Sequence, residues 1–260
     1  MNRKQTRIVA VANEKGGVGK TVTVINLGAA LAGNDNTVLI VDMDPQSAAT
    51  RSLGIDMSEK RPSVYDLIMD SLSCPVGDVI LSTRWKGIDI IPAHSDLAGA
   101  EVELVEADGR ENRLKEALEE VNGRYDFILI DTPPSLSLLT VNVFAYAKEV
   151  LVPCQTHPFS YAALEELFDT IDAVREEINP DIRVSGVLAT LYDGRTRVAR
   201  NILEKLKSGD RTKTLLFDTV IRVNATVAES AEIGKPVVYY RKSSYGALDY
   251  TAFAEEFRNR

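Results

Sequence analysis

A glycine-rich stretch near the N-terminus, "NEKGGVGKT" over residues 13–21, holds residue types that bind phosphate groups. It follows the apolar run 7–13 and leads into a helical pattern that begins at Lys20. Its three glycines carry no Cβ, so several backbone N–H groups can converge on one anion. The N-terminus of the following helix adds a partial positive charge of roughly +0.5. The stretch therefore predicts a nucleotide phosphate site, with Lys20 on the β- and γ-phosphates and Thr21 on Mg²⁺.

Three aspartates stand at the ends of two other apolar runs. "VLIVDMDPQ" ends in Asp42 and Asp44, and "FILIDTPPS" ends in Asp131. Because ligands of α/β folds lie at the carboxyl ends of the strands, these carboxylates should lie beside the phosphates. We expect Asp131 to bind Mg²⁺ through water, and Asp44 to orient or deprotonate the attacking water. The candidate Mg²⁺ ligands are Thr21, Asp42 and Asp131.

Short apolar runs alternate with longer amphipathic stretches along the chain. The apolar runs predict strands buried on both faces, at 7–13, 37–44, 88–93, 125–132, 149–155 and 182–190. The stretches between them predict helices, at 20–33, 63–70, 96–107, 110–122, 135–147, 159–178, 196–207 and 244–258. This alternation is typical of an α/β fold, with a doubly wound, mainly parallel twisted sheet and helices on both faces. We find no repeat or linker, so residues 1–260 are expected to form one domain.

The composition is that of an ordinary soluble globular protein, with 45% hydrophobic and 26% charged residues. No apolar run reaches membrane-spanning length and the start lacks a cleavage site, so a cytoplasmic protein without a membrane partner is expected. Cys74 and Cys154 lie far apart in sequence and suggest neither a disulfide framework nor a C-x-x-C metal site. The net charge of -8 still allows a local basic patch, because patches rather than totals bind phosphates.

Taken together, the motifs "KGGVGKT", "VDMDPQ" and "IDTPPS" resemble those of the ParA/MinD superfamily of P-loop ATPases with a deviant Walker A motif. The ParA/Soj branch, which partitions chromosomes and plasmids, is the most similar, and weaker similarity covers most of the chain. The resemblance implies ATP and Mg²⁺ as cofactors and an ATP-dependent homodimer. It also implies non-specific DNA binding by that dimer on the nucleoid, and a ParB-like partner that stimulates hydrolysis.

The resemblance also assigns individual residues. Lys15, at the front of the loop, is expected to contact the nucleotide of the partner subunit and to stabilise charge in trans, much as an arginine finger does. The expected catalytic residues are Lys15, Lys20 and Asp44. The expected nucleotide contacts are Lys15, Gly16, Gly17, Val18, Gly19, Lys20, Thr21, Val22, Asp131 and Asn224. Pro133 and Pro134 are placed in a switch loop that senses the γ-phosphate, and residues 219–224 near the adenine.

Two positions of the loop depart from the family pattern. Glu14 stands where the family often has glutamine, and Val22 replaces a second threonine. Because Thr21 remains, phosphate binding should be intact.

A candidate DNA surface lies in the segment 195–213, where seven basic residues stand against two acidic ones. The residues expected to contact DNA are Arg195, Arg197, Arg200 and Arg222. Such contacts reach phosphates, so the affinity should depend strongly on salt. The family's two DNA-pattern arginines fall near Val223 and on Thr226, which leaves weaker, rebuilt or absent DNA binding open. Arg195 does match a family arginine and favours DNA binding, although a charge run is also typical of a solvated helix face.

Other functions remain open on the sequence alone. A MinD-like membrane positioner would need a basic, apolar C-terminal helix, whereas "YTAFAEEFRNR" carries two adjacent glutamates. An iron-protein-like reductase would need cluster cysteines whose contexts Cys74 and Cys154 do not match, and a ligase would need a substrate pocket. Relatives that position other assemblies on the nucleoid share these motifs. The cargo, the activating partner, the hydrolysis rate and polymerisation on DNA are not specified by the sequence.

Overall fold

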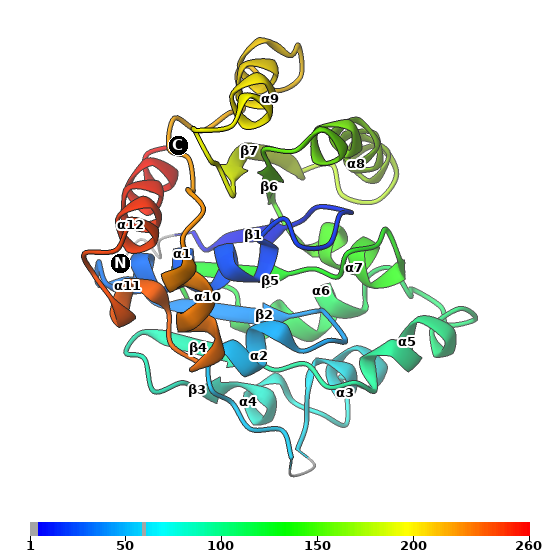
Figure 1. Cartoon of the computed structure of the whole chain (residues 1–260). Coiled ribbons are helices and arrows are strands. Elements are labelled where there is room, and N and C mark those ends of the chain that lie inside the picture. The colour runs from blue at the N-terminus through cyan, green and yellow to red at the C-terminus, as the bar shows by residue number, and fades with distance from the viewer. Residues whose placement is uncertain (1–4, 59–60) are drawn as a thin grey trace.

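The computed structural model describes residues 5–58 and 61–260, and its strands form a seven-stranded sheet (Figure 1). The strands are β1 (Arg7–Val11), β2 (Val38–Asp42), β3 (Leu81–Ser82), β4 (Ile88–Ile91), β5 (Phe127–Asp131), β6 (Glu149–Gln155) and β7 (Arg183–Thr190). Their order across the sheet is β3-β4-β2-β5-β1-β6-β7. All these neighbours pair in parallel except β3 and β4, which are antiparallel. The predicted α/β class with a mainly parallel sheet is confirmed.

Helices cover both faces of the sheet (Figure 1). They are α1 (Lys20–Ala32), α2 (Ala48–Ser52), α3 (Val64–Met69), α4 (Val76–Val79), α5 (Leu97–Glu103), α6 (Arg113–Leu118), α7 (Leu138–Tyr146), α8 (Pro158–Glu177), α9 (Arg197–Ser208), α10 (Ala225–Glu232), α11 (Val237–Tyr240) and α12 (Tyr245–Arg258). A 3₁₀ turn, Glu119–Val121, follows α6. Within the described ranges, no helix has the length and apolar character needed to cross a membrane.

Alternate residues of each strand point to opposite faces, which gives two hydrophobic cores. In β1, Ile8 and Ala10 pack with α3, α6, α7 and α8, whereas Val9 and Val11 pack with α1, α11 and α12. Every residue of β2 and β5 is buried. Strands covered on both faces need apolar residues along their length, which explains why β2 and β5 lack alternation before their final aspartates.

The register of the central strands places the predicted chemistry at one edge of the sheet. Asp42 of β2 lies opposite Asp131 of β5, and Val11 of β1 lies opposite the same Asp131 on the other side. The glycine-rich loop therefore leaves β1 directly beside the two strand-end aspartates. This edge is where a doubly wound fold binds its ligands.

The outer edge of β7 is covered by the chain that follows α9. The Val187 N–H donates to the Leu215 carbonyl over 2.8 Å, and the Val187 carbonyl accepts from the Phe217 N–H over 3.0 Å. A Cβ at Gly186 would lie 2.3 Å from the ring of Phe217, so this close approach requires glycine. The Ile221 N–H extends the cover by donating to the Ala189 carbonyl over 2.8 Å.

All the predicted strands and helices are present, with shorter bounds in most cases. The elements that the sequence patterns did not predict are β3, α2, α4, α10 and α11. Most of them have five residues or fewer, too few for a periodic pattern. The longest of them, α10, has eight residues and carries its apolar positions irregularly.

Candidate nucleotide-binding site

The glycine-rich loop has the backbone conformation of an anion cradle. Gly17 and Gly19 have φ values of 76° and 93°, a left-handed region that favours glycine. A Cβ on either residue would meet nothing within 4 Å, so the space above the loop is open to a ligand. Gly19 is the N-cap of α1 and provides no side-chain cap. The first N–H groups of α1 are therefore left for an anion.

Lys20 uses its ammonium group to bridge the loop. Nζ donates to the Asn13 carbonyl over 2.9 Å and to the Lys15 carbonyl over 3.3 Å. Its side chain is buried, which lowers the pKa of Lys20, while the Asp131 and Asp44 carboxylates act in the opposite direction. A buried ammonium needs acceptors, and an entering phosphate would replace these two carbonyls.

Asp131 is a fully buried carboxylate without hydrogen-bond partners among the described residues. Burial and the neighbouring Asp42 raise its pKa well above the ordinary value, whereas the Thr21 hydroxyl and the Lys20 ammonium oppose the rise. The Thr21 hydroxyl is close to the carboxylate but does not reach full hydrogen-bond geometry. Such an unpaired buried group is costly unless a ligand completes it, and carboxylate and hydroxyl oxygens suit Mg²⁺.

Metal binding at this site would depend on the nucleotide. Across residues 5–58 and 61–260, no group of three or more His, Cys, Asp or Glu side chains is placed to hold a metal ion. Thr21 and Asp131 fit a Mg²⁺ ion only if phosphate oxygens and water supply the other ligands.

Asp42 is also fully buried, but its oxygens are occupied. Oδ2 accepts from the backbone N–H of Thr50 over 2.8 Å and from its hydroxyl over 2.7 Å, and Oδ1 accepts from the Asp44 N–H over 3.1 Å. The Thr50 hydroxyl in turn accepts from the Ala93 N–H over 3.0 Å. Burial raises the pKa of Asp42 to about 6. These bonds give Asp42 a positioning role between β2, α2 and the exit of β4, so its metal role stays a prediction.

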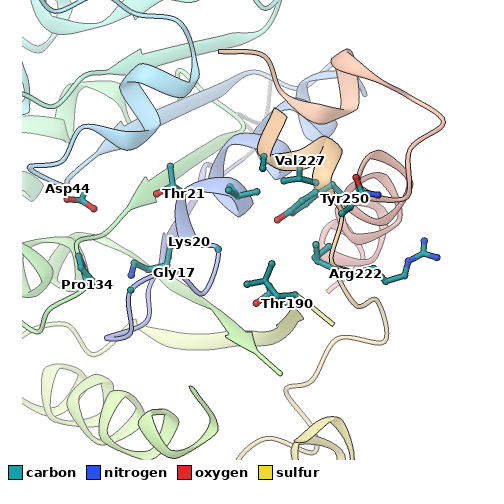
Figure 2. Close-up of a pocket in the computed structure, with 16 residues that line it drawn as sticks. Gly17, Lys20, Thr21, Asp44, Pro134, Thr190, Arg222, Val227 and Tyr250 are labelled. Carbon is teal, nitrogen blue, oxygen red and sulfur yellow. The ribbon is translucent and has the colours of Figure 1, made fainter. Parts of the chain in front are cut away.

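Asp44 lies just past β2 at the start of a tight turn. Its Oδ1 accepts from the Gln46 N–H over 2.9 Å, and its carbonyl accepts from the Ser47 N–H over 2.8 Å. Ser47 adopts a φ of 53°, which turns the chain into α2. Asp44 and Pro134 lie on the same side of the loop in Figure 2, and a Cβ added to Gly16 would lie 3.9 Å from Pro134 Cβ. The predicted water-positioning residue and the predicted switch loop thus flank the loop.

A cavity of about 360 Å³ extends from the loop toward the C-terminal helices (Figure 2). Its walls are formed by Gly16, Gly17, Gly19, Lys20, Thr21, Val22, Asp44, Pro134, Thr190, Leu191, Ile221, Arg222, Asn224, Val227, Ala228 and Tyr250. The end away from the loop is largely apolar, which suits a base. Among the predicted nucleotide contacts, Lys15, Val18 and Asp131 are not part of this wall.

Two hydrogen bonds tie the loop and α1 to the distant wall. The Thr190 hydroxyl donates to the carbonyl of the buried Val18 over 2.7 Å, and the hydroxyls of Thr23 and Tyr250 lie 3.3 Å apart. Sequence motifs did not reveal Thr190 or Tyr250, because only the tertiary fold brings them to the loop.

The far wall also contains two residues predicted from the sequence. Asn224 is the N-cap of α10, and its Oδ1 accepts from the Thr226 N–H over 3.0 Å. Arg222, assigned above to DNA, pairs instead with the buried carboxylate of Asp249 over 3.0 Å and stacks 4.1 Å from the Tyr245 ring centroid. Arg222 thus stabilises the wall of the cavity, and its DNA contact stays a prediction.

Lys15 extends away from the cavity. Its Nζ lies 5.3 Å from the ring centroid of Phe159 in α8, and no ion pair is formed with any residue in the described ranges. Its neighbour Glu14 has a raised pKa, because of burial and the proximity of Glu166.

The basic segment 195–213 is largely neutralised within the chain. Arg195 pairs with Asp193 over 2.9 Å, and Arg211 binds the α8 carboxylates of Glu165, Asp169 and Asp172. Lys207 and Lys213 pair with Glu204 and Asp210. The cations that form no ion pair within the described ranges are Arg197, Arg200 and Lys205.

Comparisons with known proteins agree with this geometry. A family model described as an AAA domain matches residues 6–184. The chain is 42% identical over 250 residues to sporulation initiation inhibitor protein Soj of Bacillus subtilis (strain 168), covering 96% of this chain and 97% of Soj. It is 40% identical over 264 residues to chromosome partitioning protein ParA of Caulobacter vibrioides (strain NA1000 / CB15N), covering 100% and 97%.

Solved structures give the same result for the fold. Cobyrinic acid a,c-diamide synthase from Mycobacterium smegmatis, with bound ADP and magnesium, superposes with a TM-score of 0.82. It is 36% identical to this chain, and the match covers 96% of this chain and 93% of the synthase. The ADP and magnesium bound to the synthase are the kinds of ligand that the glycine loop, Thr21 and Asp131 of this chain could hold.

Proposed function

Since the chain belongs to the ParA/Soj family of P-loop ATPases, we propose that it hydrolyses ATP as a dimer that binds DNA without sequence preference. Hydrolysis, stimulated by a ParB-like partner, ends the DNA-bound state. The observation that carries this proposal is the unpaired Asp131 carboxylate beside an open glycine loop and a cavity of about 360 Å³. ATP and Mg²⁺ are the ligands that complete these groups.

In this proposal the phosphates of ATP take over the hydrogen bonds of Lys20, which now go to the carbonyls of Asn13 and Lys15. Thr21 and Asp131 hold Mg²⁺, which when bound offsets negative charge on the phosphates. Asp44, held by its turn beside the loop, orients the attacking water and accepts its proton. Asp42 keeps Asp44 in place through the bond to its N–H.

Lys15 is assigned to the partner subunit's nucleotide. It lies outside the cavity of its own subunit and forms no ion pair within the described ranges, so its charge is available to a second copy. A cation supplied in trans can raise the rate by about 10³–10⁵. Hydrolysis therefore depends on dimerisation, and ATP acts as a timed switch of the assembly.

DNA binding is assigned to the exposed side of α9. Within the described ranges, three of its cations form no ion pair: Arg197, Arg200 and Lys205. A dimer would carry two copies of each. Lysines and arginines on phosphates give affinity without sequence preference and with strong salt dependence. The DNA-bound dimer would be located on the nucleoid.

The test is a DNA retardation assay with ATP and with ADP across a salt series. We expect retardation with ATP that weakens steeply as salt rises, and much weaker retardation with ADP at the same protein concentration. Size-exclusion chromatography of the same samples should show a dimer with ATP only. Equal retardation with both nucleotides, or none with either, would contradict the proposal.

A second candidate is an amide-forming ligase, which the name of the Mycobacterium smegmatis structure favours. The two candidates differ in what stimulates ATP consumption. A ligase consumes ATP in proportion to an added carboxylic acid substrate, whereas the proposed switch consumes ATP slowly without one. Phosphate release measured without any acceptor, and its response to DNA, separates them.

A further inference from the structure

The backbone of Lys15 is fixed on both sides within the glycine loop. Its N–H donates to the Asn13 side-chain oxygen over 2.9 Å, and its carbonyl accepts from the Lys20 ammonium over 3.3 Å. Asn13 is in turn anchored to the Pro153 carbonyl over 2.8 Å. These hydrogen bonds fix the backbone of Lys15 and therefore the direction in which its side chain leaves the loop.

In that direction the Lys15 ammonium meets the ring of Phe159. Phe159, the second residue of α8, is 73% exposed, and Lys15 Nζ lies 5.3 Å from its ring centroid. The ring centroid of His157, the N-cap of α8, lies 5.5 Å from that of Phe159. Pro158 at the first helical position restricts the backbone that carries both rings. An exposed phenylalanine gains little from burial, so Phe159 is held by its contacts with the His157 ring and with the Lys15 ammonium, and only the second involves a charge.

We propose that Phe159 is a positioning residue for Lys15, which holds the ammonium group on its own subunit until the partner's nucleotide is in reach. The proposal rests on the trans role of Lys15 proposed above. A cation–π contact at an exposed site is weak, whereas a charge-assisted bond to phosphate in a closing interface is strong. The ring can therefore hold the cation without preventing its transfer.

Lys20 links this transfer to ATP binding. Its ammonium now bonds the Lys15 carbonyl, and a bound phosphate would withdraw that bond. ATP binding thus frees the Lys15 backbone from one hydrogen bond. The same ATP supplies the phosphates that Lys15 of a second subunit would contact in the dimer. The side chain then needs only to leave the face of Phe159.

The holding contact can be measured in the nucleotide-free protein by NMR with ¹³C-labelled lysine. The Phe159 ring current should move the Lys15 ε-methylene signal away from the position of a free lysine, with Lys15→Arg identifying the signal. Phe159→Leu should return it to the free position, and Phe159→Trp should keep it shifted. Tyr161→Leu is the matched control, because Tyr161 lies on the same helix and its ring is 5.8 Å from Lys205 Nζ instead. A Lys15 signal that is unshifted in the wild type, or unchanged by Phe159→Leu, would overturn the proposal.

The second measurement is the ATP concentration that produces half-maximal dimerisation. Phe159→Leu should lower it by about two- to fivefold, the range expected for loss of an exposed cation–π contact. Phe159→Trp should keep it at or above the wild-type value, and ADP binding should be the same in all three proteins. In a Lys15→Ala background the leucine substitution should have no effect on dimerisation. An unchanged or higher concentration for Phe159→Leu would refute the holding role. A wild type that never dimerises would refute the proposed function, while the NMR shift would still decide the contact.

Discussion

At the scale of single residues, two neighbouring aspartates show how the same side chain acquires different roles. Asp42 and Asp131 lie opposite each other on adjacent strands, and both are fully buried. Asp42 accepts three hydrogen bonds, whereas Asp131 accepts none from the described residues. The hydrogen-bonding capacity of Asp42 is used within the fold, whereas Asp131 needs a ligand to supply its partners.

Asp131→Asn should therefore stabilise the nucleotide-free protein. The folded state raises the pKa of Asp131, so the stability that its proton contributes is lost as the pH rises above the ordinary value of 3.8. Asparagine has no such charge, so the variant should be more stable by about 1–3 kcal/mol at neutral pH, and this difference should vanish at low pH. Thermal unfolding over a pH series measures it.

The same variant should lose the additional stability that Mg²⁺–ATP gives the wild type. Asp42→Asn is the control, and it should unfold at a lower temperature, because its amide N–H₂ would face donors from Asp44 or Thr50. If Asp131→Asn destabilises the protein as Asp42→Asn does, the assignment of Asp131 to a ligand is wrong.

Asp44→Ala should separate ATP binding from ATP hydrolysis. The carboxylate caps a turn but is not part of the loop that binds the phosphates, so ATP should still bind. Loss of the water-positioning group should slow hydrolysis by about 10²–10⁴. The dimer should then persist in size-exclusion chromatography with ATP, and a wild-type hydrolysis rate would contradict the role of Asp44.

At the scale of helices, α9 shows why a count of basic residues overestimates a DNA surface. Four of the seven cations in 195–213 have acidic partners within the described ranges, and those of Arg211 come from α8. Only a structure can reveal such pairing between helices far apart in sequence. Arg197 and Arg200 are the exposed arginines that remain.

Arg197→Glu combined with Arg200→Glu should weaken DNA binding by the ATP-bound protein. Each lost phosphate contact should lower the slope of log affinity against log salt by about 1, so the two substitutions should lower it by about 2 per subunit, or about 4 for the dimer. Lys86→Glu with Lys115→Glu makes the same change in net charge at exposed positions on other elements. Equal effects of the two pairs would indicate that overall charge, rather than α9, determines binding.

The sequence predicted those elements whose patterns are long or whose motifs carry chemistry. The apolar strands, the long helices, the glycine loop and the strand-end aspartates were all identifiable, because local pattern and burial agree there. The far wall of the cavity was not, apart from the 219–224 segment that the family resemblance placed near the adenine. Tyr250 belongs to no motif, and only folding brings it to a loop more than 200 residues earlier.

At the scale of the whole molecule, the cavity is formed by segments from early and late in the chain. One end of it is the loop after β1, and the other is formed by α10 and α12. The hydroxyls of Thr23 and Tyr250 already connect these parts. A nucleotide bound across the cavity should therefore stabilise the C-terminal helices as well as the loop.

Ala228→Trp tests this arrangement by filling the far end of the cavity. The residue is exposed on α10 and lines the cavity, so the indole should block the base without disturbing a core. We expect ADP binding to weaken by at least about tenfold, or 1.4 kcal/mol, with an unchanged unfolding temperature. Ala225→Trp, on the same helix but away from the cavity wall, is the control. Equal ADP affinities in the two variants would place the base elsewhere.

The covered edge of β7 limits the kinds of polymer that this protein can form. At one side of the sheet, residues 215–221 already bond the N–H and carbonyl of Val187 and the carbonyl of Ala189 in β7, and at the other side β3 offers only two residues. Growth by adding strands from other molecules, the route to amyloid-like fibres, is thus unfavourable. Filaments or clusters must instead be held by helix and loop side chains, many of them charged. Contacts between exposed charges are screened by salt, so we expect any such assembly to weaken as the salt concentration rises.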